Sequence, residues 1–194
     1  GSPELGGAVL DALTRIRAVR PDVLYACDPV MGDDGRGFFV RPGIPELFRD
    51  RVVPRADIVT PNRFELAYLA GREIATVEDA LAAAAIIRAR GPKLVACTSL
   101  EVAERPGELA VLADTAEGSW IVRTPKLPGT LNGTGDAFTA LLLACWLRDG
   151  RADKAVADAT SAMYALVEAT HAAGSRELEI VAAQDRLADP AQRL

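Results

Sequence analysis

The sequence predicts an α/β protein in which a mostly parallel central sheet lies between two layers of helices. Short apolar runs alternate with longer helical segments along the 194 residues, and three of these runs end in a polar residue, namely Asp28, Thr60 and Thr98. Such alternation is typical of parallel strands joined by crossover helices. Ligands of these sheets bind beyond the carboxyl ends of the strands, so we expect the three residues to share one functional edge.

The first half of the chain alternates helices with short strands. Leu5, Val9, Leu13 and Ile16 recur at helical spacing and predict a helix over residues 3–19. Apolar runs predict buried strands at 23–27 and 57–60, with a glycine-rich loop at 32–37 and a short strand at 38–40 between them. Further helices are expected at 42–51, from 62 to about 70, and from 76 to 90, the last with Thr76 and Asp79 in capping-box positions.

The second half predicts strands at 93–98, 108–113 and 119–124, then a loop over 125–132. A strongly apolar helix is expected at 134–148, buried on most sides, and the last long helix at 153–170. The tail from Glu177 predicts a short strand and a helical turn. The length suits one domain of ordinary size or a large part of a bigger one.

The composition is that of a globular protein, with 49% apolar residues, 25% charged residues and a net charge of -5. No basic cluster offers a surface for nucleic acid, no apolar run reaches the ~18 residues that span a bilayer, and no signal peptide is visible. Cys27, Cys97 and Cys145 lie in apolar stretches without metal-ligand spacing. They are expected to be small buried side chains, which favours a reducing cytoplasm.

The run from Asn132 to Asp136 combines Gly133, Thr134 and Gly135 with a carboxylate at the start of a helix. Free N–H groups of a first helical turn bind anions, and Asp136 is placed to accept a proton from a hydroxyl nucleophile beside a bound phosphate. The alternative is ordinary N-capping by Asn132 or Thr134, with Asp136 complementing the helix dipole.

Two further groups of polar residues follow predicted strands. Asp28 and Asp33 lie in the loop after the first strand, where a carboxylate can hold Mg²⁺ opposite a triphosphate, although an aspartate before proline is also common in turns. Asn62 and Glu65 fit a capping box; the functional alternative puts Glu65 beside the metal and Asn62 near phosphate. Together with the helix start at residue 133, these sites would form a Mg-nucleotide site.

These motifs resemble those of the ribokinase-like superfamily, most closely the pyridoxal kinases. The resemblance rests on Asp28–Asp33, Thr60–Glu65 and Gly133–Asp136 in this order, and on the ending over 179–187, and it covers nearly the whole chain. It implies a three-layer α/β/α fold and ATP-dependent phosphorylation of the 5′-hydroxyl of pyridoxal, with Asp136 as the base. The backbone N–H groups of Gly133, Thr134, Gly135 and Asp136 would stabilise the transferring phosphoryl group.

The resemblance also implies an ATP site, a cofactor and a homodimer. Asp28 and Glu65 would serve Mg²⁺ in a Mg-ATP site. The other residues implied in ATP binding are Thr60 and Asn62 near the metal, Thr98 and Ser99 at the phosphates, and Arg123, Thr124, Pro125 and Lys126 beside adenine and ribose.

Two alternatives stay open at this point. A hydroxymethylpyrimidine kinase has the same fold, but many such kinases carry cysteine where Asp136 stands here. In pyridoxal kinases at least two βα units precede the Asp-Pro-Val motif, whereas one helix precedes it here. The sequence therefore resembles the carboxy-terminal two-thirds of one kinase domain over 1–194, with the N-terminal strands missing. It could accordingly be a catalytically incomplete nucleotide-binding fragment.

Overall fold

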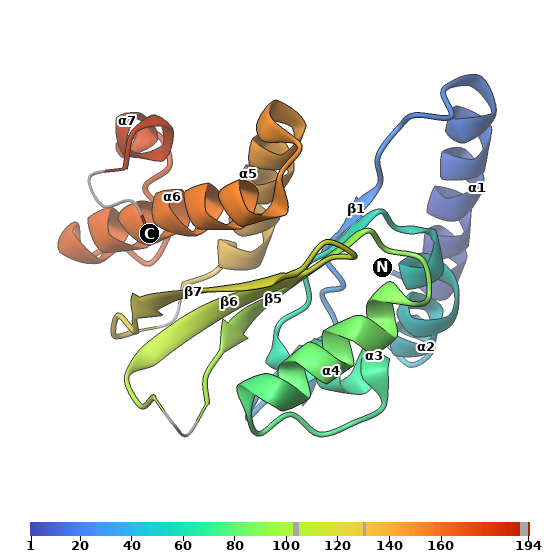
Figure 1. Ribbon diagram of the computed structural model, residues 1–194, viewed down its shortest axis with the longest axis horizontal. Coiled ribbons are helices and arrows are strands. Elements are labelled where there is room, and N and C mark those ends of the chain that lie inside the picture. Colours follow the sequence, from blue (N-terminus) through green and yellow to red (C-terminus); the bar gives the residue numbers. More distant parts are fainter. Residues whose placement is uncertain (103–104, 130, 191–193) are drawn as a thin grey trace.

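The protein is a layered α/β structure in which helices cover both faces of one central sheet (Figure 1). A computed structural model describes residues 1–102, 105–129, 131–190 and 194. The five-stranded sheet has the order β1-β4-β5-β6-β7. Helices α5 and α6 lie over one face, and α3 and α4 lie over the other (Figure 1). The fold class predicted from the sequence is confirmed.

The first half of the chain builds one side of the sheet. It contains the elements α1 (Pro3–Val19), β1 (Ala26–Cys27), β2 (Gly32–Asp33), β3 (Gly37–Phe38), α2 (Ile44–Leu47), η1 (Phe48–Val52), η2 (Val53–Arg55), β4 (Ile58–Val59), α3 (Arg63–Ala70) and α4 (Val77–Arg88). β2 and β3 form a small antiparallel hairpin where the sequence predicted a loop. The helix expected at 42–51 is shorter, because α2 passes into a π-helical turn and then a 3-10 turn.

The second half contains β5 (Leu94–Leu100), β6 (Glu108–Asp114), β7 (Ser119–Pro125), α5 (Thr134–Asp149), α6 (Ala152–Ala172) and α7 (Gln184–Ala188). Helix α5 was expected to be buried on most sides, but only Phe138, Leu142 and Cys145 are buried, so it has one apolar stripe toward the sheet. The strand expected in the tail is absent from the described residues after α6, which form turns and α7.

Parallel pairing holds for half of the sheet. β1, β4 and β5 are parallel, whereas β6 pairs antiparallel with β5, and β7 with β6. The difference follows from connection length. Only residues 101–107 separate β5 from β6, and a parallel crossover needs a dozen residues or more.

Two hydrophobic clusters hold the layers together. One packs α3 and α4 against the sheet around Leu66, Ile87 and Val95, and the other packs α5 and α6 around Phe138 and Leu142. The cysteines are free and buried, as expected from their apolar surroundings. Among the described residues, no helix has both the length and the apolar character needed to cross a membrane.

Helix α4 offers a stability test away from the sheet edge. The Thr76 hydroxyl accepts a hydrogen bond from the Asp79 N–H at 3.1 Å, and the Asp79 carboxylate accepts from the Thr76 N–H at 3.1 Å. We expect Thr76→Ala to lower the free energy of unfolding by about 1 kcal/mol, because the helix loses its N-cap acceptor. Urea denaturation measures this as a lower midpoint at unchanged slope. Thr76→Ser keeps the hydroxyl and should restore most of the loss; equal losses in both variants would contradict the cap assignment.

Candidate functional site

A cavity of about 1070 Å³ opens at the carboxyl ends of the parallel strands, at the edge that the sequence predicted. Asp28 lines it after β1, Thr60 after β4, and Thr98 from β5. The first turn of α5 also lines it. The residues predicted for the site that line this cavity are Asp28, Asp33, Thr60, Asn62, Glu65, Thr98, Ser99, Thr124, Pro125, Gly133, Thr134, Gly135 and Asp136.

Helix α5 begins on the cavity without a side-chain cap. Its N-cap is Gly133, whose φ of 81° lies in the left-handed region, and no described side chain bonds to the first turn. The first backbone bond within the helix is donated by Ala137 to the Gly133 carbonyl, so the N–H groups of the preceding three residues remain available. The capping by Asn132 or Thr134 that the sequence left open does not occur. The start of α5 therefore has the form of an anion site.

Asp28 lies against the first turn of α5 on the cavity wall. Its Oδ2 is buried and has no hydrogen-bond partner among the described residues. A Cβ added at Gly135 would lie 3.0 Å from that oxygen, so the glycine allows the carboxylate to approach the helix start closely. Burial, and then the charge of Asp136, raises the pKa of Asp28 to about 6. An unpartnered buried carboxylate oxygen of this kind is suited to a cation.

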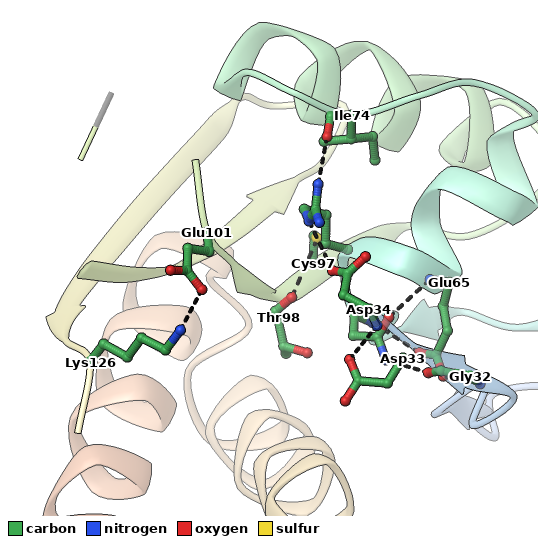
Figure 2. Close-up of polar contacts among 11 residues, drawn as sticks. Gly32, Asp33, Asp34, Glu65, Ile74, Cys97, Thr98, Glu101 and Lys126 are labelled. Carbon is green, nitrogen blue, oxygen red and sulfur yellow. Dashed lines mark hydrogen bonds and ion pairs between the residues drawn. The ribbon is translucent and has the colours of Figure 1, made fainter. Parts of the chain in front are cut away.

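Glu65 is fully committed to backbone contacts. Its Oε1 accepts hydrogen bonds from the N–H groups of Met31 at 2.9 Å and Gly32 at 3.5 Å, and its Oε2 accepts from Asn62 at 2.9 Å. Only 3% of the residue is exposed, and burial raises the pKa of its carboxyl to about 7 although these N–H groups oppose the rise. The capping box of α3 is thus real, and Glu65 also fixes the segment after β1 (Figure 2).

Thr60 and Asn62 join the elements around the cavity. The Thr60 hydroxyl lies 2.7 Å from that of Thr139 on α5, and Asn62 donates from Nδ2 to the Gly32 carbonyl at 2.8 Å. Asn62 also forms an isolated parallel bridge with Thr98. These contacts connect the loop after β1, the start of α3, β5 and α5.

Ser99 sits at an irregularity in β5. The register of β5 with β6 shifts between Cys97 and Leu100, and Ser99 has a φ of 51°, which is unusual for a residue other than glycine. The sequence predicted that this strand ends at Thr98, whereas it continues through the bulge to Leu100. The bulge leaves Ser99 exposed on the cavity wall, next to Thr98.

The segment predicted to border a base and sugar is only partly at the cavity. Thr124 and Pro125 line it, but Arg123 and Lys126 are not among its described wall residues. The Arg123 guanidinium lies 3.9 Å from a Glu108 carboxylate oxygen. Lys126 forms a 2.6 Å ion pair with Glu101, and Figure 2 shows this pair apart from Glu65 and Gly32.

Several cavity residues were not singled out from the sequence. Arg36 and Phe39 come from the hairpin region, where the Arg36 guanidinium lies 5.3 Å from the centre of the Phe39 ring. For Arg36, the charged residues and glycines of the loop at 32–37 could have indicated a place at the site. Residues from α6 and beyond carried no motif; they include Tyr164, Arg176 and the single histidine, His171, for which the sequence favoured a structural or solvated role.

The side chains at the cavity suit a cation such as Mg²⁺ that takes few ligands from the protein, rather than a metal ion held entirely by protein side chains. Among the described residues, no group of three or more His, Cys, Asp or Glu side chains is arranged to hold a metal ion. Mg²⁺ commonly takes one or two carboxylates and completes its shell with water and phosphate oxygens. Asp28 lines the cavity and has one oxygen without a partner among the described residues, so it meets that requirement, while the Glu65 oxygens already accept three N–H bonds.

Known proteins of two kinds are similar to this chain. A family model described as phosphomethylpyrimidine kinase matches residues 7–180. Pyridoxal kinase PdxY of Rubrobacter xylanophilus is 49% identical over 100% of this chain and 67% of its own length, and that of Granulibacter bethesdensis is 48% identical over 98% and 68%. Pyridoxal kinase from Leishmania donovani, solved with ADP and ginkgotoxin, superposes with a TM-score of 0.90 at 31% identity, covering 98% of this chain and 68% of that chain.

The contact between Gly135 and Asp28 gives a test of the site. We expect Gly135→Ala to weaken Mg-ATP binding, because the new methyl group crowds the Asp28 carboxylate, while alanine's helix propensity keeps the fold at least as stable. Calorimetry with Mg-ATP and thermal melting measure the two effects separately. Gly7→Ala in α1 is the matched control, since its Cβ meets only Arg51 at 3.9 Å. Unchanged Mg-ATP affinity in Gly135→Ala would show that the approach has no role in binding.

Proposed function

Since the chain belongs to the pyridoxal kinase family, which has the ribokinase-like fold, we propose that it transfers the γ-phosphoryl group of ATP to the 5′-hydroxyl of pyridoxal. The product would be pyridoxal 5′-phosphate, the outcome of vitamin B6 salvage. The observation that carries the proposal is the uncapped start of α5, where Asp136 and free backbone N–H groups lie beside Asp28 on one cavity. ADP, with pyridoxine or ginkgotoxin, occupies related structures from Leishmania donovani.

Asp136 is the proposed base. It lies in the first turn of α5 and is exposed on the cavity, so a substrate hydroxyl can reach its carboxylate. The hydroxyl oxygen forms a bond to the γ-phosphorus, the bond from that phosphorus to the bridging oxygen of ADP breaks, and the hydroxyl proton passes to Asp136. The backbone N–H groups of Gly133, Thr134, Gly135 and Asp136 would face the charge that spreads over the equatorial phosphoryl oxygens.

Asp28 is the residue proposed to hold Mg²⁺, with Glu65 acting behind it. When bound, Mg²⁺ supplies positive charge that neutralises the phosphates of ATP. Asp28 has the free oxygen that such an ion needs, and Glu65 keeps the Met31–Gly32 backbone in place beside it. Thr60 and Asn62 are assigned to the surroundings of the metal, and Thr98 and Ser99 to the phosphates.

Other parts of the proposal concern the rest of the nucleotide and the assembly. Thr124 and Pro125, on the cavity wall, are assigned to the side of adenine and ribose. Arg123 and Lys126 belong to the same segment, and a nucleotide could recruit them only after their contacts with Glu108 and Glu101 change. We also propose that residues 1–194 are one partial kinase domain and that the protein works as a homodimer in the cytoplasm.

A pyrimidine substrate is the second candidate, because the matching family model is described as phosphomethylpyrimidine kinase. A substrate panel separates the two candidates. The protein that carries this sequence should phosphorylate pyridoxal in preference to hydroxymethylpyrimidine, and exclusive turnover of the pyrimidine would refute the first choice. Mg-ATP binding with no turnover of either compound would identify a nucleotide-binding remnant.

The base assignment predicts the behaviour of Asp136→Asn. Turnover of pyridoxal should fall at least ~100-fold, because asparagine cannot accept the hydroxyl proton, while the affinity for Mg-ATP stays close to that of the parent protein. Initial rates and calorimetry measure the two quantities. Asp11→Asn, on the solvent face of α1, is the control for removal of one exposed carboxylate and should change neither. Near-normal turnover by Asp136→Asn would refute the assignment.

The raised pKa of Asp28 predicts how Mg-nucleotide binding depends on pH. Because burial favours the protonated acid, this group stabilises the ligand-free fold at low pH and loses that contribution as the pH rises from about 4 to about 6. Cation binding requires the ionised form, so affinity for Mg-ATP should increase through pH 6. Calorimetry between pH 5 and 7.5 measures the rise.

Asp28→Asn is the control for this pH dependence. Titration of ATP itself is common to both proteins, so the difference between their profiles reports the Asp28 carboxylate, including the part of the Glu65 pKa shift that the Asp28 charge causes. The variant should bind Mg-ATP weakly and lack the component centred near pH 6. Identical profiles would exclude Asp28 as the residue that holds the cation.

A further inference from the structure

The cavity is lined by more acidic than basic side chains. The acids on its described wall are Asp28, Asp33, Glu65 and Asp136. The arginines described there are Arg36 and Arg176, and no lysine is among the described wall residues. Because Mg-ATP keeps a net negative charge after the metal is bound, a nucleotide placed among these acids needs a further cationic partner from the protein.

Arg36 lies in the turn between β2 and β3, and this hairpin is packed against α3 on one side. The Phe38 ring meets the rings of Phe64 and Tyr68 edge-on, with 5.1 Å and 5.0 Å between the ring centres. Successive residues of an extended strand point to opposite sides, and Phe39, the next residue, accordingly lines the cavity. The hairpin therefore has one side fixed on α3 and another that borders the cavity.

The Arg36 guanidinium has no ion-pair partner among the described residues. It lies 5.3 Å from the centre of the Phe39 ring, and both residues are exposed. The acids beside it in the turn make other contacts, since Asp34 pairs with Arg63 at 2.9 Å and Asp33 accepts the Asp34 N–H at 2.8 Å. A guanidinium stacked on an aromatic ring is held in place while its N–H donors stay free at its edge.

We propose that Arg36 binds the terminal phosphate of Mg-ATP and that Phe39 positions its guanidinium, an inference that rests on the proposed phosphoryl transfer. The hairpin follows the loop of Asp28, the residue assigned to Mg²⁺, and the metal ions of such enzymes bridge the β- and γ-phosphates. Thr124 and Pro125, assigned to adenine and ribose, lie on a different strand. A planar guanidinium can donate two parallel N–H bonds to phosphate oxygens, so Arg36 would distinguish ATP from ADP.

A comparison of ATP with ADP tests this assignment. Calorimetry measures the affinity for ADP and for the non-hydrolysable β,γ-imido analogue of ATP, each with Mg²⁺ and without pyridoxal. Arg36→Ala should weaken binding of the ATP analogue ~10-fold or more, because two charge-assisted hydrogen bonds are lost, and should change the affinity for ADP little. Arg36→Lys keeps the charge without the fork of donors and should recover part of the loss.

Arg41→Ala is the matched control, because Arg41 is exposed just after the same hairpin and is not among the described wall residues. It should change neither affinity. Equal losses for both nucleotides in Arg36→Ala, or no loss for either, would overturn the proposal and leave the proposed phosphoryl transfer intact. A loss specific to the ATP analogue in Arg176→Ala, with none in Arg36→Ala, would overturn it in favour of the other arginine. If the parent protein binds neither nucleotide, this inference and the proposed function fail together.

Discussion

The buried carboxylate of Glu65 is the contact on which the cavity edge depends. It lies in the first turn of α3, after β4, and its two oxygens accept backbone N–H groups from Met31, Gly32 and Asn62. A carboxylate in an apolar interior is costly unless such donors satisfy it. Because the donors come from segments about thirty residues apart, the same side chain caps a helix and fixes the loop that follows β1.

That loop determines where the charges of the site lie. It begins with Asp28, whose free oxygen meets the start of α5 at Gly135. Burial and then the charge of Asp136 raise the pKa of Asp28, and burial, with a smaller contribution from the charge of Asp28, raises the pKa of Glu65. Such crowding of acids is unfavourable by itself and is relieved when a cation enters. At the proposed Mg-nucleotide site, the arrangement would thus lower the stability of the ligand-free fold and raise the affinity for a metal-bound anion.

The sequence predicted well those features whose signals are local. The capping pairs Thr76–Asp79 and Asn62–Glu65 are formed as their spacing indicated, and the polar residues that follow or terminate short apolar runs do meet at one edge of the sheet. A short connection made β6 antiparallel, and the length of residues 101–107 could have indicated this. The contact of Glu65 with Met31 and the contribution of α6 to the cavity arise from tertiary packing, which no local pattern encodes.

Helices α3 and α5 both begin at this edge of the sheet, but only α3 has a side-chain cap. At α3, the Asn62 side chain accepts the Glu65 N–H and the Glu65 side chain accepts the Asn62 N–H, so the start of the helix is capped from within the chain. At α5, Gly133 supplies a tight turn but no acceptor, and the N–H groups face the cavity unpaired by any described side chain. The positive end of a helix dipole is therefore neutralised internally at one site and left for a ligand at the other. This contrast supports the proposed anion site at α5, beside Asp136, and leaves α3 to support the loop that carries Asp28.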